Sequence, residues 1–140
     1  MGKVTAIRNF ASLVAGERVT ISRNRIGWSA SMSEMRITLP ANLMENDELD
    51  KLFRKDFINR CPLAQGFANV TLSILHEIGH IFHREEYIFF DAKEYSKVHG
   101  EEHYRLLPEV VATDWAIAWL QDPAHRKQAK AFEKEFFRSK

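Results

Sequence analysis

Residues 76–80 read His76-Glu77-Ile78-Gly79-His80, and this pentapeptide decides how the rest of the chain is interpreted. Two histidines four residues apart on a helix lie on the same face, where they can bind one divalent metal ion. Glu77 has the place of a general base, which takes a proton from an activated water molecule. The pattern His-Glu-x-x-His is typical of zinc hydrolases, most of which cleave peptide bonds.

The flanking residues predict that the motif lies on a buried helix spanning residues 64–84. At about 100° per residue, one face of this helix collects the apolar side chains: Phe67, Val70, Ile74, Leu75, Ile78, Ile81 and Phe82. His76 and His80 fall on the opposite face, which we expect to line a cleft. Inside a helix, Gly79 costs about 1 kcal/mol relative to alanine, so we expect another part of the chain to approach closely there.

A catalytic zinc ion usually has three protein ligands and one position open to water, so the two histidines need a partner. Glu109 is the best candidate, because it opens the run 108–120, which is predicted to be a helix with proline in its first turn. Ala112 and Ala116 share its face. These small residues would let the second helix pack closely against the histidine helix and carry the carboxylate to the metal.

Other ligands fit less well. His83 lies about 10 Å along the helix axis from His76, too far for one ion to bridge all three histidines. The long metzincin pattern requires a glycine and a further histidine where this chain has His83 and Glu86. Glu86 stays an alternative third ligand, together with the acidic and histidine residues of 91–103.

The motif His76-Glu-Ile-Gly-His80 is followed by Glu109-x-x-Ala112-x-x-Trp115-Ala116-x-x-x-Leu120. With these two segments the chain resembles the ImmA/IrrE family of small gluzincin-type metallopeptidases, over roughly residues 34 to 123. The resemblance implies a zincin-like α+β fold, in which a small mixed or antiparallel β-sheet packs on the active-site helix with further helices around it. It also implies one Zn²⁺ per chain, bound by His76, His80 and Glu109.

The chain departs from the family pattern four residues after the ligand glutamate, where the family usually has asparagine. That residue is thought to orient a ligand histidine through a hydrogen bond. Here the position is Thr113, whose hydroxyl can still accept a histidine N–H. Asp114 is rotated by about 100° and is expected to point away. The helix-turn-helix and the C-terminal extension of other members are not recognisable, so we expect a bare catalytic core.

Peptide hydrolysis assigns further roles to residues near the motif. Glu77 acts as general base and then delivers the proton to the leaving amine. The tetrahedral oxyanion needs an electrophilic partner besides zinc. Four residues between the two motif helices are candidates, and the sequence does not choose among them: Tyr95, His99, His103 and Tyr104.

Composition predicts one cytoplasmic, soluble domain over residues 1–140. The chain is 45% hydrophobic, and its 20 basic and 19 acidic residues leave a net charge of +1. This charge gives no electrostatic case for nucleic-acid binding. The single Cys61 excludes an internal disulfide, and we expect it to be a small structural residue. A signal peptide and a membrane-spanning run are not recognisable, so no membrane association is expected.

The remaining pattern predicts a helix at 5–15 ending at Gly16, a strand at 19–22, and a hairpin of strands 25–32 and 35–39. The second hairpin strand is the candidate for an edge strand that pairs with an extended substrate. Helices are predicted at 48–60 and from Asp122-Pro123 to about 137, with residues 87–100 as a connection that covers the cleft.

These features predict a zinc metallopeptidase, and the family resemblance implies a protein or peptide substrate such as an intracellular transcriptional regulator. The alternative is a non-catalytic, metal-stabilised binding module of the same fold that recognises a protein or nucleic-acid partner. A weaker alternative is another zinc hydrolase, acting for example on a small amide. The sequence leaves the substrate, the physiological metal and the oligomeric state open.

Overall fold

The computed structural model of the protein describes residues 2–23, 27–31, 33–41, 43, 48–85, 97–98 and 100–139. Within these residues the fold is α+β, with five α-helices and one mixed three-stranded sheet. The helices are α1 (Lys3–Ala15), α2 (Glu48–Arg60), α3 (Asn69–Phe82), α5 (Leu107–Leu120) and α6 (Pro123–Arg138). Two 3-10 helices, η1 (Pro62–Gly66) and η3 (Gly100–Arg105), and the strands β1 (Thr20–Arg23), β2 (Ser29–Ala30) and β3 (Arg36–Leu39) complete the order. The predicted α+β class with a small mixed sheet is confirmed.

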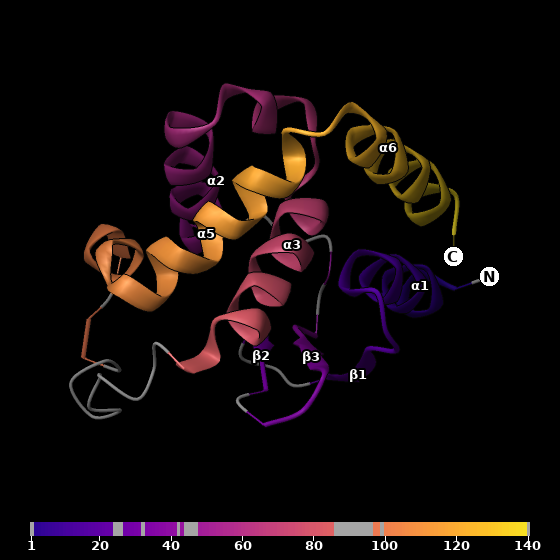
Figure 1. Ribbon diagram of the computed structural model, residues 1–140, viewed down its shortest axis with the longest axis horizontal. Helices are drawn as coiled ribbons and strands as arrows, with labels where there is room; N and C mark the ends of the chain where they lie inside the picture. Colours follow the sequence, from indigo (N-terminus) through magenta and orange to yellow (C-terminus); the bar gives the residue numbers. More distant parts are fainter. Residues whose placement is uncertain are drawn as a thin grey trace.

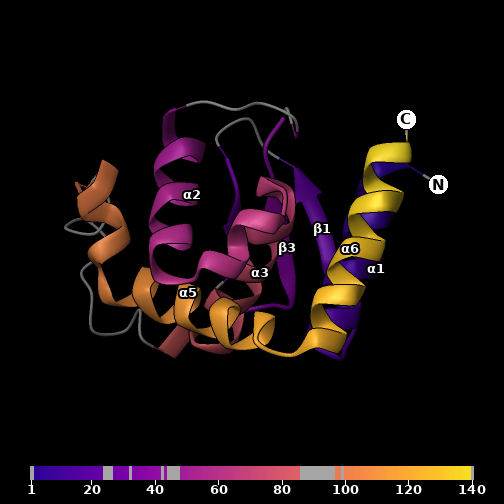
Figure 2. The ribbon, with the colours of Figure 1, turned by 90° about the horizontal axis from the view of Figure 1, so that it is seen from above.

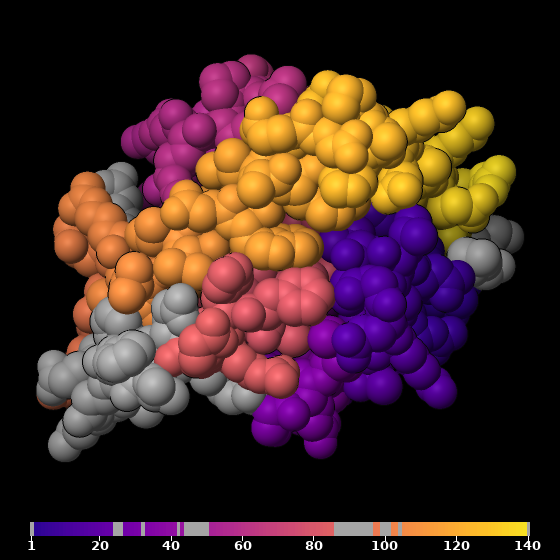
Figure 3. Space-filling model, in the orientation of Figure 1, coloured from indigo at the N-terminus to yellow at the C-terminus, as the bar shows by residue number. Residues whose placement is uncertain are grey.

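Helix α3 lies in the middle of the molecule, with the sheet on one side and α5 across another (Figure 1). Most of the predicted apolar face of α3 is buried, as expected for a core helix. Phe82 was predicted to belong to this buried face, which is wrong. Its side chain is 38% exposed, and its ring packs against Trp115 at 5.4 Å between ring centroids. It lies on the last turn of α3, which reaches the surface beside α5 in Figure 3.

The predicted helix over 64–84 is wrong at its start, because 62–66 forms the separate η1 and Ala68 is an extended N-cap. Side chains from two other helices stabilise the interruption between η1 and α3. Glu133 of α6 accepts hydrogen bonds from the Ala68 amide at 2.7 Å and from Thr71 Oγ1 at 2.6 Å, so it caps α3 from outside. Arg54 of α2 donates to the Phe67 carbonyl at 2.6 Å.

The sheet has the order β1-β3-β2, with β1 parallel and β2 antiparallel to β3. The predicted hairpin is confirmed, although its first strand is short. The expectation that 35–39 forms an edge strand is wrong, because β1 pairs along the other side of β3 and makes it central. The alternation of apolar and polar residues in 35–39 correctly predicted the buried face of the strand, since Ile37 and Leu39 are fully buried. It did not predict which strands pair with it. Within the described residues, β2 is the edge strand on the side of α3.

Helices α1 and α6 pack side by side, and both chain ends lie at the same corner (Figures 1 and 2). The ring of Phe10 stacks on Phe132 at 4.5 Å between centroids, and α1 ends at Gly16, whose φ of 74° is the left-handed conformation that glycine favours. Cys61 is buried with a free thiol, as expected. No described helix is long and apolar enough to cross a membrane. The predicted covering segment 87–100 lies almost entirely outside the described residues.

Candidate metal centre

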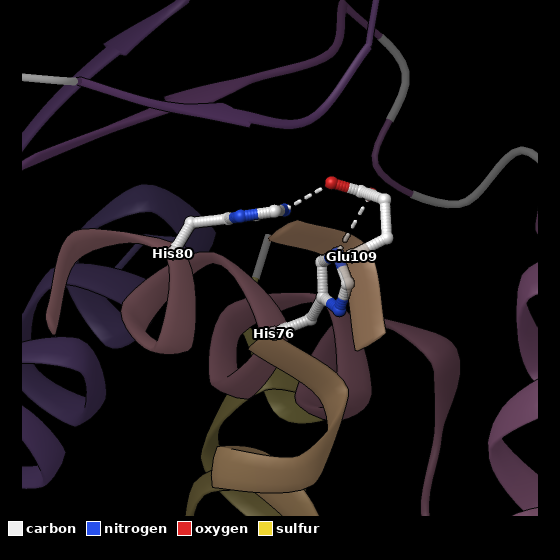
Figure 4. Close-up of side chains that lie close together, drawn as sticks. All are labelled: His76, His80 and Glu109. Carbon is white, nitrogen blue, oxygen red and sulfur yellow. Dashed lines mark hydrogen bonds and ion pairs between the residues drawn. The ribbon is translucent and has the colours of Figure 1, made fainter. Parts of the chain in front are cut away.

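Three side chains from two helices converge on one point. His76 and His80 project from successive turns of α3, and Glu109 reaches them from the first turn of α5 (Figure 4). His80 Nε2 lies 2.8 Å from Glu109 Oε2, and His76 Nε2 lies 3.2 Å from Glu109 Oε1. One potential ligand atom from each residue lies within 4.8 Å of the others, so the group could hold a metal ion. The structure thus brings the three predicted ligands together.

The close approach of α3 and α5 depends on Gly79, which lies between the two histidines in the sequence. A Cβ atom on Gly79 would lie 2.5 Å from the carbonyl oxygen of Ala112 and 2.9 Å from its Cα. Only glycine fits against this backbone, which confirms the predicted close contact at this position. Ala112 is one turn beyond Glu109 on α5, so the contact sets the distance of the carboxylate from the histidines.

The orientation of His76 is fixed from two sides. Its Nδ1 lies 2.9 Å from Thr113 Oγ1, and the ring of Phe53 packs edge-on against it at 5.1 Å between centroids. In the tautomer that leaves Nε2 available to a metal, the Nδ1–H donates to the Thr113 hydroxyl. Thr113 therefore makes the contact with a candidate ligand histidine that the sequence suggested. Asp114 points away, as predicted, and forms an ion pair with Arg60.

The donor set, two imidazoles and a carboxylate, is of the kind that binds a divalent metal ion. Zinc binds histidine nitrogen and carboxylate oxygen at about 2.0–2.2 Å, which places neighbouring ligand atoms roughly 3.4 Å apart. The histidine Nε2 atoms lie at hydrogen-bond distance from the Glu109 carboxylate, 3.2 Å from Oε1 and 2.8 Å from Oε2, and one ligand atom of each residue lies within 4.8 Å of the others. All three residues are buried, with exposed fractions of 4% for His76, 7% for His80 and 4% for Glu109.

The buried charges of this group are strongly coupled. Burial raises the pKa of Glu109, but hydrogen bonds from His103, His76 and His80 outweigh it and hold the pKa well below its ordinary value. Burial and the neighbouring His80 lower the pKa of His76. Burial also lowers the pKa of His80, but the hydrogen bond to Glu109 and the charges of Glu109 and Glu77 together outweigh it, so the net direction is upward. A carboxylate that stays ionised among imidazoles is suited to bind a cation.

Glu77 is buried beside this group, with 6% of its surface exposed. Burial, reinforced by the charge of Glu109 and opposed by His80 and His103, raises the pKa of the Glu77 carboxyl to about 7. Within the described part of the chain, its carboxylate makes no hydrogen bond or ion pair, and its oxygens are not among the fully buried unpaired polar atoms. A carboxylate with a pKa near 7 can both accept and release a proton under physiological conditions.

His103 is the one candidate electrophile whose side chain the structure places at the site. Its Nε2 lies 3.0 Å from Glu109 Oε1, and its side chain is 29% exposed. The hydrogen bond to Glu109 raises the pKa of His103. The sequence named His103 as a candidate but did not predict its contact with Glu109, and the only signal was that His103 precedes Glu109 by six residues, just ahead of a helix start.

The remaining candidates stay untested. Tyr95, His99 and the alternative ligand Glu86 lie outside the described residues, and of Tyr104 only the backbone, in η3, is described. His83 caps the end of α3 and is not part of the group that could hold a metal.

Comparisons with protein families, curated proteins and solved structures found no match for this chain. The ImmA/IrrE resemblance therefore rests on the two sequence motifs alone.

Proposed function

We propose that this protein is a zinc-dependent metallopeptidase of the ImmA/IrrE type, with a zincin-like fold. His76, His80 and Glu109 would hold one Zn²⁺, and Glu77 would be the general base. The observation that carries the proposal is the buried Glu77 carboxylate beside a His-His-Glu group able to hold a metal. This combination places a base on α3, directly after the first histidine of a metal group that α5 completes with Glu109.

A structural role accounts poorly for Glu77. A buried polar group without a partner costs several kcal/mol, and a buried charge costs more. Burial leaves 6% of Glu77 exposed and raises the pKa of its carboxyl to about 7, so the charged form is disfavoured at this position. A structural zinc site is normally closed by four protein ligands and needs no base, whereas catalytic sites use three ligands and keep one position open. The His-His-Glu group with an adjacent carboxylate corresponds to the second kind.

The proposed reaction is hydrolysis of an amide bond. Two imidazoles and a carboxylate suit zinc, which supplies Lewis-acid activation of water and of the scissile carbonyl when bound. Glu77 takes one proton from the attacking water as the new carbon–oxygen bond forms. It then passes that proton to the leaving nitrogen as the carbon–nitrogen bond breaks. A pKa of about 7 suits both transfers.

A peptide substrate is favoured by the sheet next to the site. Strand β2 ends the sheet on the side of α3, so an extended segment could add to it through main-chain hydrogen bonds. Strand β2 is therefore the candidate for pairing with a substrate, because residues 35–39, which the sequence suggested for that role, form the central strand. Main-chain pairing would give affinity for an extended peptide, and the family resemblance points to a regulatory protein such as a transcriptional regulator.

The second candidate function is a metal-stabilised binding module without catalysis. The observation in its favour is burial, because none of His76, Glu77, His80 and Glu109 is more than 7% exposed. The two functions differ in their need for Glu77. Only hydrolysis requires its proton transfer, so Glu77→Gln separates them.

The test compares wild type and Glu77→Gln, each loaded with zinc, on a cell lysate and on a library of peptides, with new N-termini identified by mass spectrometry. We expect zinc-dependent cleavage by wild type, loss of cleavage in the variant, and equal metal content in both. Equal cleavage by the variant, or no cleavage by a wild type that binds zinc, would contradict the peptidase proposal. The second result would favour the binding module.

A further inference from the structure

His103 is held between two partners at the outer side of the metal centre. Its Nε2 lies 3.0 Å from Glu109 Oε1, and the backbone of Val98 accepts a second hydrogen bond from the ring. The 3-10 helix η3, which carries His103, packs against both α2 and α5. The imidazole is therefore fixed relative to the carboxylate by its own element and by both of its hydrogen bonds.

Metal binding would affect the histidine contacts of Glu109 differently: those with His76 and His80 would be lost, whereas that with His103 would remain. His76 and His80 contact the carboxylate through Nε2, the atom that each would use as a metal ligand. A ligating nitrogen no longer donates a hydrogen bond, so these two contacts are lost when metal binds. His103 is not part of the group whose atoms could share the ion. Its N–H stays available to Glu109.

We propose that His103 is a positioning residue for the metal centre, which donates a hydrogen bond to the Glu109 carboxylate and holds it in the orientation that meets His76 and His80. The inference rests on the metal site of the proposed function. It assigns to His103 a task distinct from ligation. Partners of this kind orient a ligand, and losing one typically reduces metal affinity about 10–100-fold.

The test measures zinc affinity by competition with a chromophoric chelator, for wild type, His103→Phe and His103→Gln. The phenylalanine keeps a ring but cannot donate, whereas the glutamine amide restores a donor. The matched control is His83→Phe, the same substitution at the half-buried end of α3, outside the group that could hold a metal. Circular dichroism checks the fold of each variant, and the spectrum of bound Co²⁺ reports the ligand set.

We expect His103→Phe to bind zinc about 10–100-fold more weakly, with His103→Gln closer to wild type and His83→Phe unchanged. The Co²⁺ spectrum of the saturated variants should keep the wild-type form, because the ligands are the same. Wild-type affinity in His103→Phe would overturn the proposal, as would a Co²⁺ spectrum that reports a lost ligand. If His103→Phe does not fold, wild-type affinity in a folded His103→Ala overturns it equally. A wild type that binds no zinc would instead contradict the proposed function itself.

Discussion

Replacing Gly79 by alanine tests how the fold sets the geometry of the site. The new Cβ would lie 2.5 Å from the Ala112 carbonyl oxygen and 3.0 Å from its carbonyl carbon. An ordinary carbon–oxygen contact is about 3.4 Å, so α3 and α5 must separate by roughly 1 Å. Both sides of this contact are backbone, so no side-chain rotation relieves it. Removing the Ala112 methyl group would not relieve it either.

The energetic effect combines two opposing terms. Alanine is favoured over glycine inside a helix by about 1 kcal/mol. Overpacking costs about 1–3 kcal/mol when neighbours can adapt, and more is expected when the obstacle is backbone. We expect a net destabilisation of about 2 kcal/mol, which lowers the Tm by roughly 8 °C for a chain of this length. Because Glu109 moves with α5, zinc affinity should fall by at least about tenfold.

Thermal unfolding of the metal-free protein and chelator competition measure the two effects separately. Gly66→Ala is the matched control, because a Cβ there would meet only Lys130 Nζ at 4.0 Å. The control should match wild type within about 0.5 kcal/mol. If Gly79→Ala proves as stable as wild type and binds zinc equally well, the account of helix contact and site geometry is refuted.

Thr113→Val removes the oxygen that lies 2.9 Å from His76 Nδ1 and should weaken zinc binding about 10–100-fold in the same competition assay, whereas Thr113→Ser should not. Glu77 has a folded-state pKa of about 7 against 4.5 for the free side chain, so its contribution to stability is fully present below about pH 4.5 and is lost as pH rises through 7. In urea unfolding of the metal-free protein, the free energy of unfolding of wild type minus that of Glu77→Gln should fall by roughly 3 kcal/mol between pH 4.5 and 8. A difference that does not change with pH would contradict this. Glu133→Ala removes the cap of α3 and should lower the free energy of unfolding by about 1–2 kcal/mol in urea. Lys134→Ala is the neutral control on the same helix. Equal unfolding midpoints for both variants would rule out the capping role.

The sequence was most informative where the chemistry is local. The spacing of His76 and His80 and the helical period of their apolar neighbours placed both histidines on one face of α3. The glycine at position 79 indicated a close approach, and the small residues after Glu109 indicated the helix that makes it. Each inference required only residues within one or two helix turns.

The sequence was least informative where interacting residues lie far apart along the chain. The start of α3 depends on Glu133 and Arg54, which lie 65 and 13 residues from Ala68 and Phe67 respectively. Period-two alternation in 35–39 predicts a strand and its buried face, but not that β1 adds in parallel on its far side. The contact between His103 and Glu109 depends on the turn from η3 into α5, and no spacing rule encodes that turn.

The central claim is that His76, His80 and Glu109 hold one zinc ion, and metal content tests it most directly. Elemental mass spectrometry would be applied to wild type and Glu109→Gln after both have been supplied with zinc and freed of excess. The account predicts about one zinc ion per wild-type chain and little in the variant. A wild type without metal, or a variant that retains a full equivalent, would contradict it.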